Sequence, residues 1–289
     1  MRRPIRARRG LPLRAVAPNA ITAMALCSGL SGVQFAVKAR MMENDLPLLP
    51  QGADFVALAD RIGTHWQLAV AFVLIAGILD GIDGRIARLL HGESRFGAEL
   101  DSLADAISFG VSPALILYLW SLSSLPRFGW MAALMLAVFA ALRLARFNAA
   151  IDADEQPHKS AGFLTGVPAP AGAGLALLPM FLWFWTEIPV LRSPYLIAPW
   201  TAFVAFLMVS SIATWSWGSL RLRRNIRFEA LALVVIVIAA AVTAPWHTVS
   251  ALSLAYLLAM PFGIASYARV RRQRASGSSA PAVPVPPSA

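Results

Sequence analysis

Cysteine and charge are both scarce in this sequence of 289 residues. The only cysteine, Cys27, stands in an apolar run, so neither a disulfide framework nor a thiolate zinc site can form. We therefore expect Cys27 to be a buried, inert thiol. Charged residues make up 14% of the chain and hydrophobic residues 58%, whereas soluble domains carry about 25% charged residues. This composition excludes an ordinary soluble domain and favours a membrane protein.

The apolar residues are gathered in runs of about 18–25 residues, the length at which a helix crosses about 30 Å of hydrocarbon. A transmembrane barrel would instead alternate polar and apolar residues. The sequence therefore predicts an all-α fold, a polytopic transmembrane helical bundle of about eight spans. We expect these spans near residues 18–37, 66–90, 99–122, 129–148, 166–186, 195–218, 229–245 and 248–267.

The same pattern divides the chain into parts. Residues 1–17 form a basic tail, 18–218 a membrane core and 219–267 two additional transmembrane helices. Within the core, the 39–65 segment is polar and mixed in charge, which predicts a loop. The Ser/Pro/Ala-rich residues 268–289 cannot bury a core, so we expect a disordered tail. Tryptophans near the span ends are expected to anchor the chain at the membrane interface, as is typical of this residue: Trp66, Trp120, Trp183, Trp200 and Trp246.

The net charge of +10 raises the question of a nucleic-acid partner. The positive residues, however, cluster in short segments between apolar runs, as in the cytoplasmic loops of membrane proteins. With the N-terminus inside, 20 of the 25 Lys and Arg residues fall on one side. We therefore expect no nucleic-acid partner, both termini in the cytoplasm, and a multi-pass protein of the cell (inner, cytoplasmic) membrane.

Four aspartates fall within 26 residues, where the second predicted span ends and the third begins. Asp80 and Asp83 share one helical face, and Asp101 and Asp105 share a face of the next helix, because residues three or four apart are neighbours on a helix. Two antiparallel helices joined by a short turn would point these carboxylates at one another. Four ionised groups in a half-buried cleft need compensation, by protonation or by bound cations. Carboxylate oxygens select Mg²⁺, Mn²⁺ or Ca²⁺ over zinc.

The other residues on these faces fit a phosphate ligand. Arg88 lies on the face of Asp80 and Asp83, where it could contact an anionic diphosphate. Small residues on the two faces leave room for a ligand, or let the helices pack closely. Helix capping at the water interface would explain one or two of the aspartates but not all four. A cation or proton translocator is a remote alternative, because its carboxylates should lie near mid-span rather than at one interface.

The sequence from Asp80 to Asp105 resembles the signature of the CDP-alcohol phosphotransferase family, DxxDGxxARx8GxxxDxxxD. Every fixed residue and every spacing of the signature is present. Flanking stretches are similar to the phosphatidylserine synthase branch of that family, although Val167 stands where the branch commonly has Leu. These stretches are Pro18-Asn19-x2-Thr22, DSLADAISFGVSPA (101–114), ALRLARFNA (141–149) and FLTGVPAPAGA (163–173).

The resemblance implies an enzyme that transfers the phosphatidyl group of CDP-diacylglycerol to the hydroxyl of L-serine, giving phosphatidylserine and CMP. The same chemistry with glycerol 3-phosphate, inositol phosphate or another alcohol as acceptor is an open alternative. The resemblance further implies a homodimer and two divalent cations, Mg²⁺ or Mn²⁺, whereas the distribution of Lys and Arg places the active site at the cytoplasmic face. The cations would be held by Asp80, Asp83, Asp101 and Asp105, with Asp105 also the general base.

Further residues are assigned to the two substrates. Arg143, Arg146 and Asn148 are candidates for binding the serine carboxylate or a phosphate, although an arginine at a span end is ordinarily a topology determinant. Ser94, Asn19 and Thr22 could instead be helix-capping residues. The candidates for contact with the CDP-lipid are Gly84, Ala87, Arg88, Ser94, Gly97, Asn19 and Thr22.

Overall fold

The computed structural model describes residues 13–48, 54–92, 94–151, 163–210, 213–215 and 227–277. Helices make up most of this part of the chain, and two three-residue strands pair antiparallel. The helices and strands are α1 (Leu13–Asp45), η1 (Leu46–Leu48), α2 (Phe55–Leu89), α3 (Arg95–Asp105), the π-helix η2 (Ala106–Val111), α4 (Ser112–Trp120), η3 (Leu122–Ser124), α5 (Phe128–Ile151), β1 (Phe163–Thr165), α6 (Ala169–Thr186), η5 (Pro189–Arg192), α7 (Pro194–Val209), β2 (Ala213–Trp215), α8 (Arg227–Thr243) and α9 (Pro245–Gly277).

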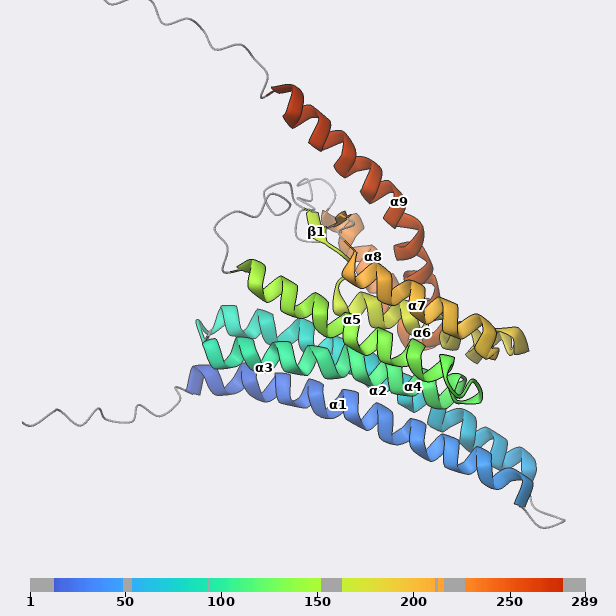
Figure 1. The fold of residues 1–289 in the computed structure, drawn as a ribbon. Helices are drawn as coiled ribbons and strands as arrows, with labels where there is room; N and C mark the ends of the chain where they lie inside the picture. Colours follow the sequence, from blue (N-terminus) through green and yellow to red (C-terminus); the bar gives the residue numbers. More distant parts are fainter. Residues whose placement is uncertain are drawn as a thin grey trace, which may run out of the picture.

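The helices form a bundle in which α1 and α2 run side by side along one flank (Figure 1). α3, η2 and α4 follow one another without a break and pack against α1. α5 packs on α7, and α6 packs on both α7 and α9. α8 contacts α9, so these last two helices join the bundle chiefly through α6.

Small residues let α1 approach its neighbours closely. A Cβ added at Gly32 would lie 2.6 Å from the carbonyl oxygen of Ala69 on α2, and one at Gly29 would lie 2.9 Å from the Cα of Ser108 in η2. Ser28 Oγ also donates a hydrogen bond of 2.7 Å to the carbonyl of Phe72 on α2. Close backbone approach through small residues is the usual way in which membrane helices pack.

An ion pair inside a cage of tryptophans closes one end of the bundle. Arg192 Nη2 lies 2.6 Å from Glu43 Oε1, and Trp66 Nε1 donates to the same oxygen at 2.8 Å. The Arg192 guanidinium carbon lies 5.5–5.9 Å from the ring centroids of Trp66, Trp120 and Trp183. We call this group the Arg192 clamp; it joins residues of α1, α2, α4, α6 and η5.

The prediction that Trp66 and Trp120 are interfacial anchors is therefore wrong. Both rings are buried, because they turn inward to cover the Arg192 guanidinium instead of outward to the membrane interface. The prediction for Cys27 is also wrong, since its side chain lies on an exposed face of α1.

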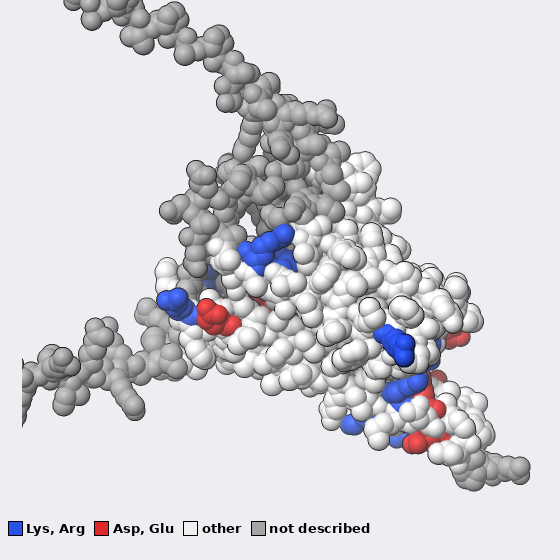
Figure 2. Space-filling model, viewed as in Figure 1, with Lys and Arg blue, Asp and Glu red and all other residues white. Residues whose placement is uncertain are grey.

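Five helices are long and apolar enough to cross a membrane: Val16–Leu48, Phe55–Leu89, Arg95–Trp120, Phe128–Ala149 and Ala169–Thr186. Two shorter apolar helices, Pro194–Val209 and Leu231–Thr243, follow. On the face seen in Figure 2, the charged side chains lie toward two ends and leave a broad uncharged zone between them. A multi-pass helical membrane protein is thus confirmed, and the span count of eight stays a prediction.

The predicted loop at 39–65 is wrong, because α1 continues to Asp45 and α2 begins at Phe55. Residues 39–45 contain Ala, Arg, two Met and Glu, all good helix formers, and this outweighs their polarity. Asp54 starts α2 as an N-cap by accepting the backbone N–H of Ala57 at 3.0 Å. The connection between the two helices is therefore shorter than expected.

Three other boundaries differ from those predicted. α1 begins at Leu13, within the predicted basic tail. α7 ends at Val209 instead of 218, because Ser210 leaves the helical conformation (ψ 154°) and β2 then pairs with β1. α9 runs to Gly277, so the predicted start of the disordered tail at residue 268 is too early. The Arg, Gln and Ala residues after position 267 favour helix. Residues 278–289 lie outside the described part of the chain.

Candidate active site

The last third of α2 and the second half of α3 carry the signature aspartates. α2 ends at Leu89, and His91 takes a left-handed conformation (φ 49°) that turns the chain. Ser94 then caps α3, its Oγ accepting the backbone N–H of Gly97 at 3.0 Å. This confirms the helix-cap reading of Ser94. The signature is thus folded as two helices joined by a short turn.

Three carboxylates, one on α2 and two on α3, come together further along these helices. Asp80, Asp101 and Asp105 each offer an oxygen, and these oxygens all lie within 4.8 Å of one another. We call these three residues the acidic cluster. Asp80 and Asp105 are half-buried, which makes mutual repulsion without a cation costly. Three hard oxygen donors at this spacing fit a Mg²⁺ or Mn²⁺ ion.

Asp83 lies one helical turn from Asp80 and is held differently. Its side chain is buried, and its Oδ2 accepts a hydrogen bond of 2.6 Å from Thr22 Oγ1 on α1. The Thr22 hydroxyl also lies 3.1 Å from the carbonyl of Pro18. Asp83 therefore ties α1 to α2 next to the acidic cluster, and this contact could not be foreseen from a separation of 61 residues.

The small residues of the signature have two different surroundings. A Cβ added at Gly84 would meet no atom of the described residues within 4 Å, so this part of the chain leaves the α2 side of the site open. Arg88 is exposed there and donates from Nε to the carbonyl of Gly84 at 3.0 Å. At Gly97, by contrast, a Cβ would lie 2.8 Å from Asn19 Oδ1. Gly84 thus leaves room for a ligand, whereas Gly97 lets α3 pack on α1.

α5 covers the third side of the site with Arg143, Arg146 and Asn148. Arg143 is half-buried, its charge acts on Asp105, and its Nε has no hydrogen-bond partner among the described residues. Arg146 donates to the carbonyl of Ser210 at 3.2 Å, just past the end of α7. Asn148 Nδ2 donates to Ser102 Oγ at 2.8 Å. The latter two residues therefore have structural partners, and Arg143 faces the acidic cluster.

The predicted residues thus gather at one end of the bundle, on α1, α2, α3 and α5. Sequence reasoning missed Ser102, whose hydroxyl positions Asn148, although it lies next to Asp101 in the signature. It also missed the π-helix that begins directly after Asp105. π-Helical turns are rare and frequent at functional sites, but nothing in the sequence AISFGV distinguishes one from α-helix.

Comparison with known proteins decides the family. The family model described as CDP-alcohol phosphatidyltransferase matches residues 15–208, most of the chain and all of the site. The chain belongs to the CDP-alcohol phosphatidyltransferase family. A second model, CDP-alcohol phosphatidyltransferase 2, matches residues 225–261 in α8 and α9.

Relatives within this family are named CDP-diacylglycerol–serine O-phosphatidyltransferase. The chain is 36% identical to the protein of Mycobacterium bovis over 267 residues, covering 90% of this chain and 82% of the relative. It is 37% identical to a Mycobacterium tuberculosis protein over the same shares of both chains. A Helicobacter pylori relative is 41% identical over 118 residues, covering 41% of this chain and 48% of the relative. The predicted resemblance is confirmed.

Proposed function

We propose that this CDP-alcohol phosphatidyltransferase moves the phosphatidyl group of CDP-diacylglycerol to the hydroxyl of L-serine, giving phosphatidylserine and CMP. The observation that carries the proposal is the acidic cluster, in which the signature aspartates Asp80, Asp101 and Asp105 converge beside the open face of Gly84. The printed names of the mycobacterial relatives support serine as the acceptor. α5 supports it as well, because Arg143 can offer a guanidinium to a carboxylate beside the reacting groups.

The reaction exchanges one phosphorus–oxygen bond for another. The serine hydroxyl oxygen forms a bond to the phosphorus that carries diacylglycerol, and the bond from that phosphorus to the CMP oxygen breaks. The serine proton must leave as the new bond forms. Asp105 is our candidate for the base that accepts this proton, because Asp105 belongs to the acidic cluster and interacts electrostatically with Arg143.

The donor set fits the cations that the family implies. Asp80, Asp101 and Asp105 bring oxygens within 4.8 Å of one another, and Asp83 is the fourth candidate ligand. When bound, two Mg²⁺ or Mn²⁺ ions would neutralise the negative charge on the diphosphate and on the CMP leaving group. Asp83 would have to serve while its Oδ2 accepts the Thr22 hydroxyl, so its other oxygen is the one available.

The remaining candidates surround the cluster in two groups. Arg143 is the best placed of the three candidates for binding the acceptor. Arg146 and Asn148 would have to bind it while keeping their hydrogen bonds to Ser210 and Ser102. On the nucleotide side, Gly84 and Ala87 would let the cytidine and ribose lie against α2, and Arg88 would contact phosphate. Ser94, Gly97, Asn19 and Thr22 would then support the nucleotide site chiefly by joining α1 to the signature helices.

We place this site at the cytoplasmic face of the cell membrane, with both termini inside and the protein working as a homodimer. Support for the orientation comes from the Lys and Arg residues, which are concentrated on the side of the acidic cluster. A proton or cation translocator is disfavoured because all three carboxylates lie in the half of each span that is nearer the α2–α3 turn, and none lies in the far half.

The test is an acceptor panel. Purified protein is incubated with CDP-diacylglycerol and Mn²⁺ or Mg²⁺, and separately with serine, glycerol 3-phosphate and inositol phosphate. CMP and the lipid product are measured. We expect a lipid product only when serine is the acceptor. A lipid product formed only with another alcohol would keep the reaction class and replace serine as the acceptor. Release of no CMP with any of these acceptors would contradict the proposal.

A further inference from the structure

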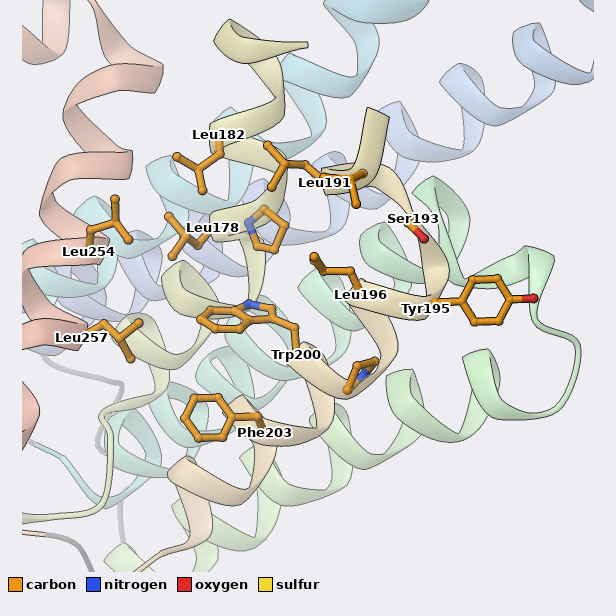
Figure 3. A pocket seen from close by; sticks show the side chains of 13 residues that line it. Leu178, Leu182, Leu191, Ser193, Tyr195, Leu196, Trp200, Phe203, Leu254 and Leu257 are labelled. Carbon is orange, nitrogen blue, oxygen red and sulfur yellow. The ribbon is translucent and has the colours of Figure 1, made fainter. Parts of the chain in front are cut away.

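An apolar groove lies between α6, α7 and α9, away from the acidic cluster. Its volume is about 800 Å³, within the range of about 300–1,000 Å³ that is usual for small-ligand sites. In Figure 3, the α9 side chains face those of α6 and α7 across the groove. The main lining residues are Leu178 and Leu182 of α6, Leu196 and Trp200 of α7, and Leu254 and Leu257 of α9.

Particular residues of the sequence create this space. Pro179 and Pro199 both line the groove from within α6 and α7, where their compact rings stand in place of longer side chains. The Trp200 indole N–H donates to the carbonyl of Leu175 at 2.9 Å, which fixes the ring against α6. α9 is fastened to α6 by the Trp185–His247 and Phe184–Trp246 ring contacts and packs little on α7. The groove is thus a gap between α7 and α9 with α6 as its floor.

The groove opens at the end of the bundle opposite the acidic cluster. α7 begins at Pro194, beside the Arg192 clamp, and ends at Val209, next to the Ser210 carbonyl that Arg146 holds. The groove follows the first three turns of α7, as far as Phe203. Its few hydroxyl-bearing residues, Ser193 and Tyr195, lie at the start of α7, and none of the described residues that line it is charged.

We propose that this groove binds one acyl chain of a bilayer phospholipid drawn from the leaflet opposite the acidic cluster. α6 is long and apolar enough to cross a membrane, and α7 is a shorter apolar helix. α9 adds Leu254 and Leu257 to the lining, so the groove presents an apolar surface to the surrounding hydrocarbon. Beyond the two hydroxyl-bearing residues at the start of α7, water would find no polar side chain among the lining residues, and an empty space would forfeit van der Waals contacts. An acyl chain has no hydrogen-bonding groups and bends to an irregular shape, whereas a second copy would need a protruding ridge that matches the gap.

The bound chain has a structural consequence that goes beyond the transfer reaction. By filling the gap it connects α7 to α9, which otherwise joins the bundle through α6 and β2. The lipid in the groove is not the reacting one, because the acidic cluster lies at the other end of the bundle. The binding therefore does not depend on which alcohol is the acceptor.

Tryptophan fluorescence offers a direct test, because bromine atoms on acyl chains quench an indole that they touch. The purified chain in detergent is titrated with phosphatidylglycerol carrying brominated acyl chains, and the unbrominated lipid corrects for other effects. We expect quenching that saturates near one lipid per chain and loses most of its amplitude in Trp200→Phe. The matched control is Trp130→Phe on α5, an exposed ring outside the groove, which should leave the saturable quenching intact.

A second variant tests the groove itself. Leu254→Phe with Leu257→Phe narrows the groove and should abolish the saturable phase while the thermal unfolding midpoint stays near that of the parent. Quenching that only rises linearly with lipid, and is the same in Trp200→Phe, would mean non-specific lipid contact and overturn the proposal. A Trp200 that is shielded from quenching in a chain that sediments as a dimer would assign the groove to a second copy. Displacement by CDP-diacylglycerol, but not by unbrominated phosphatidylglycerol, would assign the groove to the substrate.

Discussion

Asp105 has the most demanding position of the four signature aspartates. One of its carboxylate oxygens lies within 4.8 Å of a carboxylate oxygen of Asp80 and of Asp101. Asp105 also faces Arg143, and the π-helix begins directly after it. A carboxylate that gives its lone pairs to a cation is a poor base, so the two proposed roles compete. We infer that Asp105 makes the weakest metal contact of the set, and that Asp80, Asp83 and Asp101 supply most of the cation binding.

Substitutions by asparagine separate these roles. Asp105→Asn should lower kcat by about 10²–10⁴-fold, the usual contribution of a general base, with little change in the affinity for CDP-diacylglycerol. Asp80→Asn should weaken CDP-lipid binding together with the rate, because it removes a charged ligand. The measurements are steady-state kinetics and CDP-lipid binding over a series of Mn²⁺ concentrations.

Excess Mn²⁺ provides the control for this comparison. It should rescue part of the Asp80→Asn defect and none of the Asp105→Asn defect. If Asp105→Asn loses CDP-lipid binding as completely as Asp80→Asn does, Asp105 is chiefly a ligand. The serine proton would then go to water, to phosphate or to another side chain.

At the scale of helices, the site depends on how closely α1 can approach α2 and α3. Gly32 and Gly29 permit that approach, and the Thr22–Asp83 hydrogen bond fixes it beside the acidic cluster. The Arg192 clamp holds the other end of the same helices. α1 therefore connects the end of the bundle that the Arg192 clamp holds with the end that carries the acidic cluster, where the substrates would bind.

The Gly32 contact predicts a sharp difference between two alanine substitutions. Gly32→Ala places a methyl group 2.6 Å from the Ala69 carbonyl and should destabilise the fold by about 1–3 kcal/mol, as overpacking does. Gly63→Ala on α2 meets no atom within 4 Å in the described part of the chain and should stabilise the fold by about 0.5–1 kcal/mol, because alanine favours helix. Thermal unfolding in detergent measures both. Equal midpoints for the two variants would contradict the close packing of α1 on α2.

The clamp makes a second prediction at this scale. Arg192→Met removes the cation that donates to Glu43 Oε1, the oxygen that also accepts the Trp66 N–H, and should cost about 1.5–3 kcal/mol, the value of a charged hydrogen bond. Arg40→Gln is the matched control, because it removes the more exposed partner of Glu43 and should cost less than about 1 kcal/mol. Urea or thermal unfolding distinguishes the two. A loss as large in Arg40→Gln would show that the cage of rings adds nothing.

The helices could be predicted from apolar runs, and the acidic cluster from the spacing of the signature, because both patterns are local in sequence. Contacts between distant segments could not. The Arg192–Glu43 pair spans 149 residues, and no local pattern relates the two. Trp66 and Trp120 were misplaced for the same reason, since a tryptophan near a span end looks alike whether it turns outward or covers a buried arginine. The 39–65 segment was misassigned because its charges concealed good helix formers.

At the scale of the whole molecule, the two ends of the bundle differ. One end carries the acidic cluster with the open face of Gly84, and the other carries the Arg192 clamp and the mouth of the apolar groove. The charged side chains in Figure 2 lie toward these ends and leave an uncharged zone between them. We predict that the end with the acidic cluster faces the cytoplasm.

Two reporters test that orientation. A reporter placed near Ser94 should be cytoplasmic, because the turn between α2 and α3 lies among the Lys- and Arg-rich segments. One placed near Asp54, at the start of α2, should report the opposite compartment. Accessibility of the two positions to an impermeant thiol reagent in intact cells, with Cys27 replaced, gives the same information. If both positions report one compartment, α2 does not cross the membrane.

The central claim is phosphatidyl transfer to serine at the acidic cluster. The most direct measurement follows CMP and serine-derived lipid in one reaction, with CDP-diacylglycerol, Mn²⁺ and isotopically labelled serine, for the parent chain and for Asp101→Asn. We predict equal amounts of CMP and labelled phosphatidylserine from the parent chain. Neither product should form with Asp101→Asn, although the variant unfolds at a similar temperature. Near-parent turnover by Asp101→Asn, or CMP without labelled lipid from the parent chain, would contradict the account.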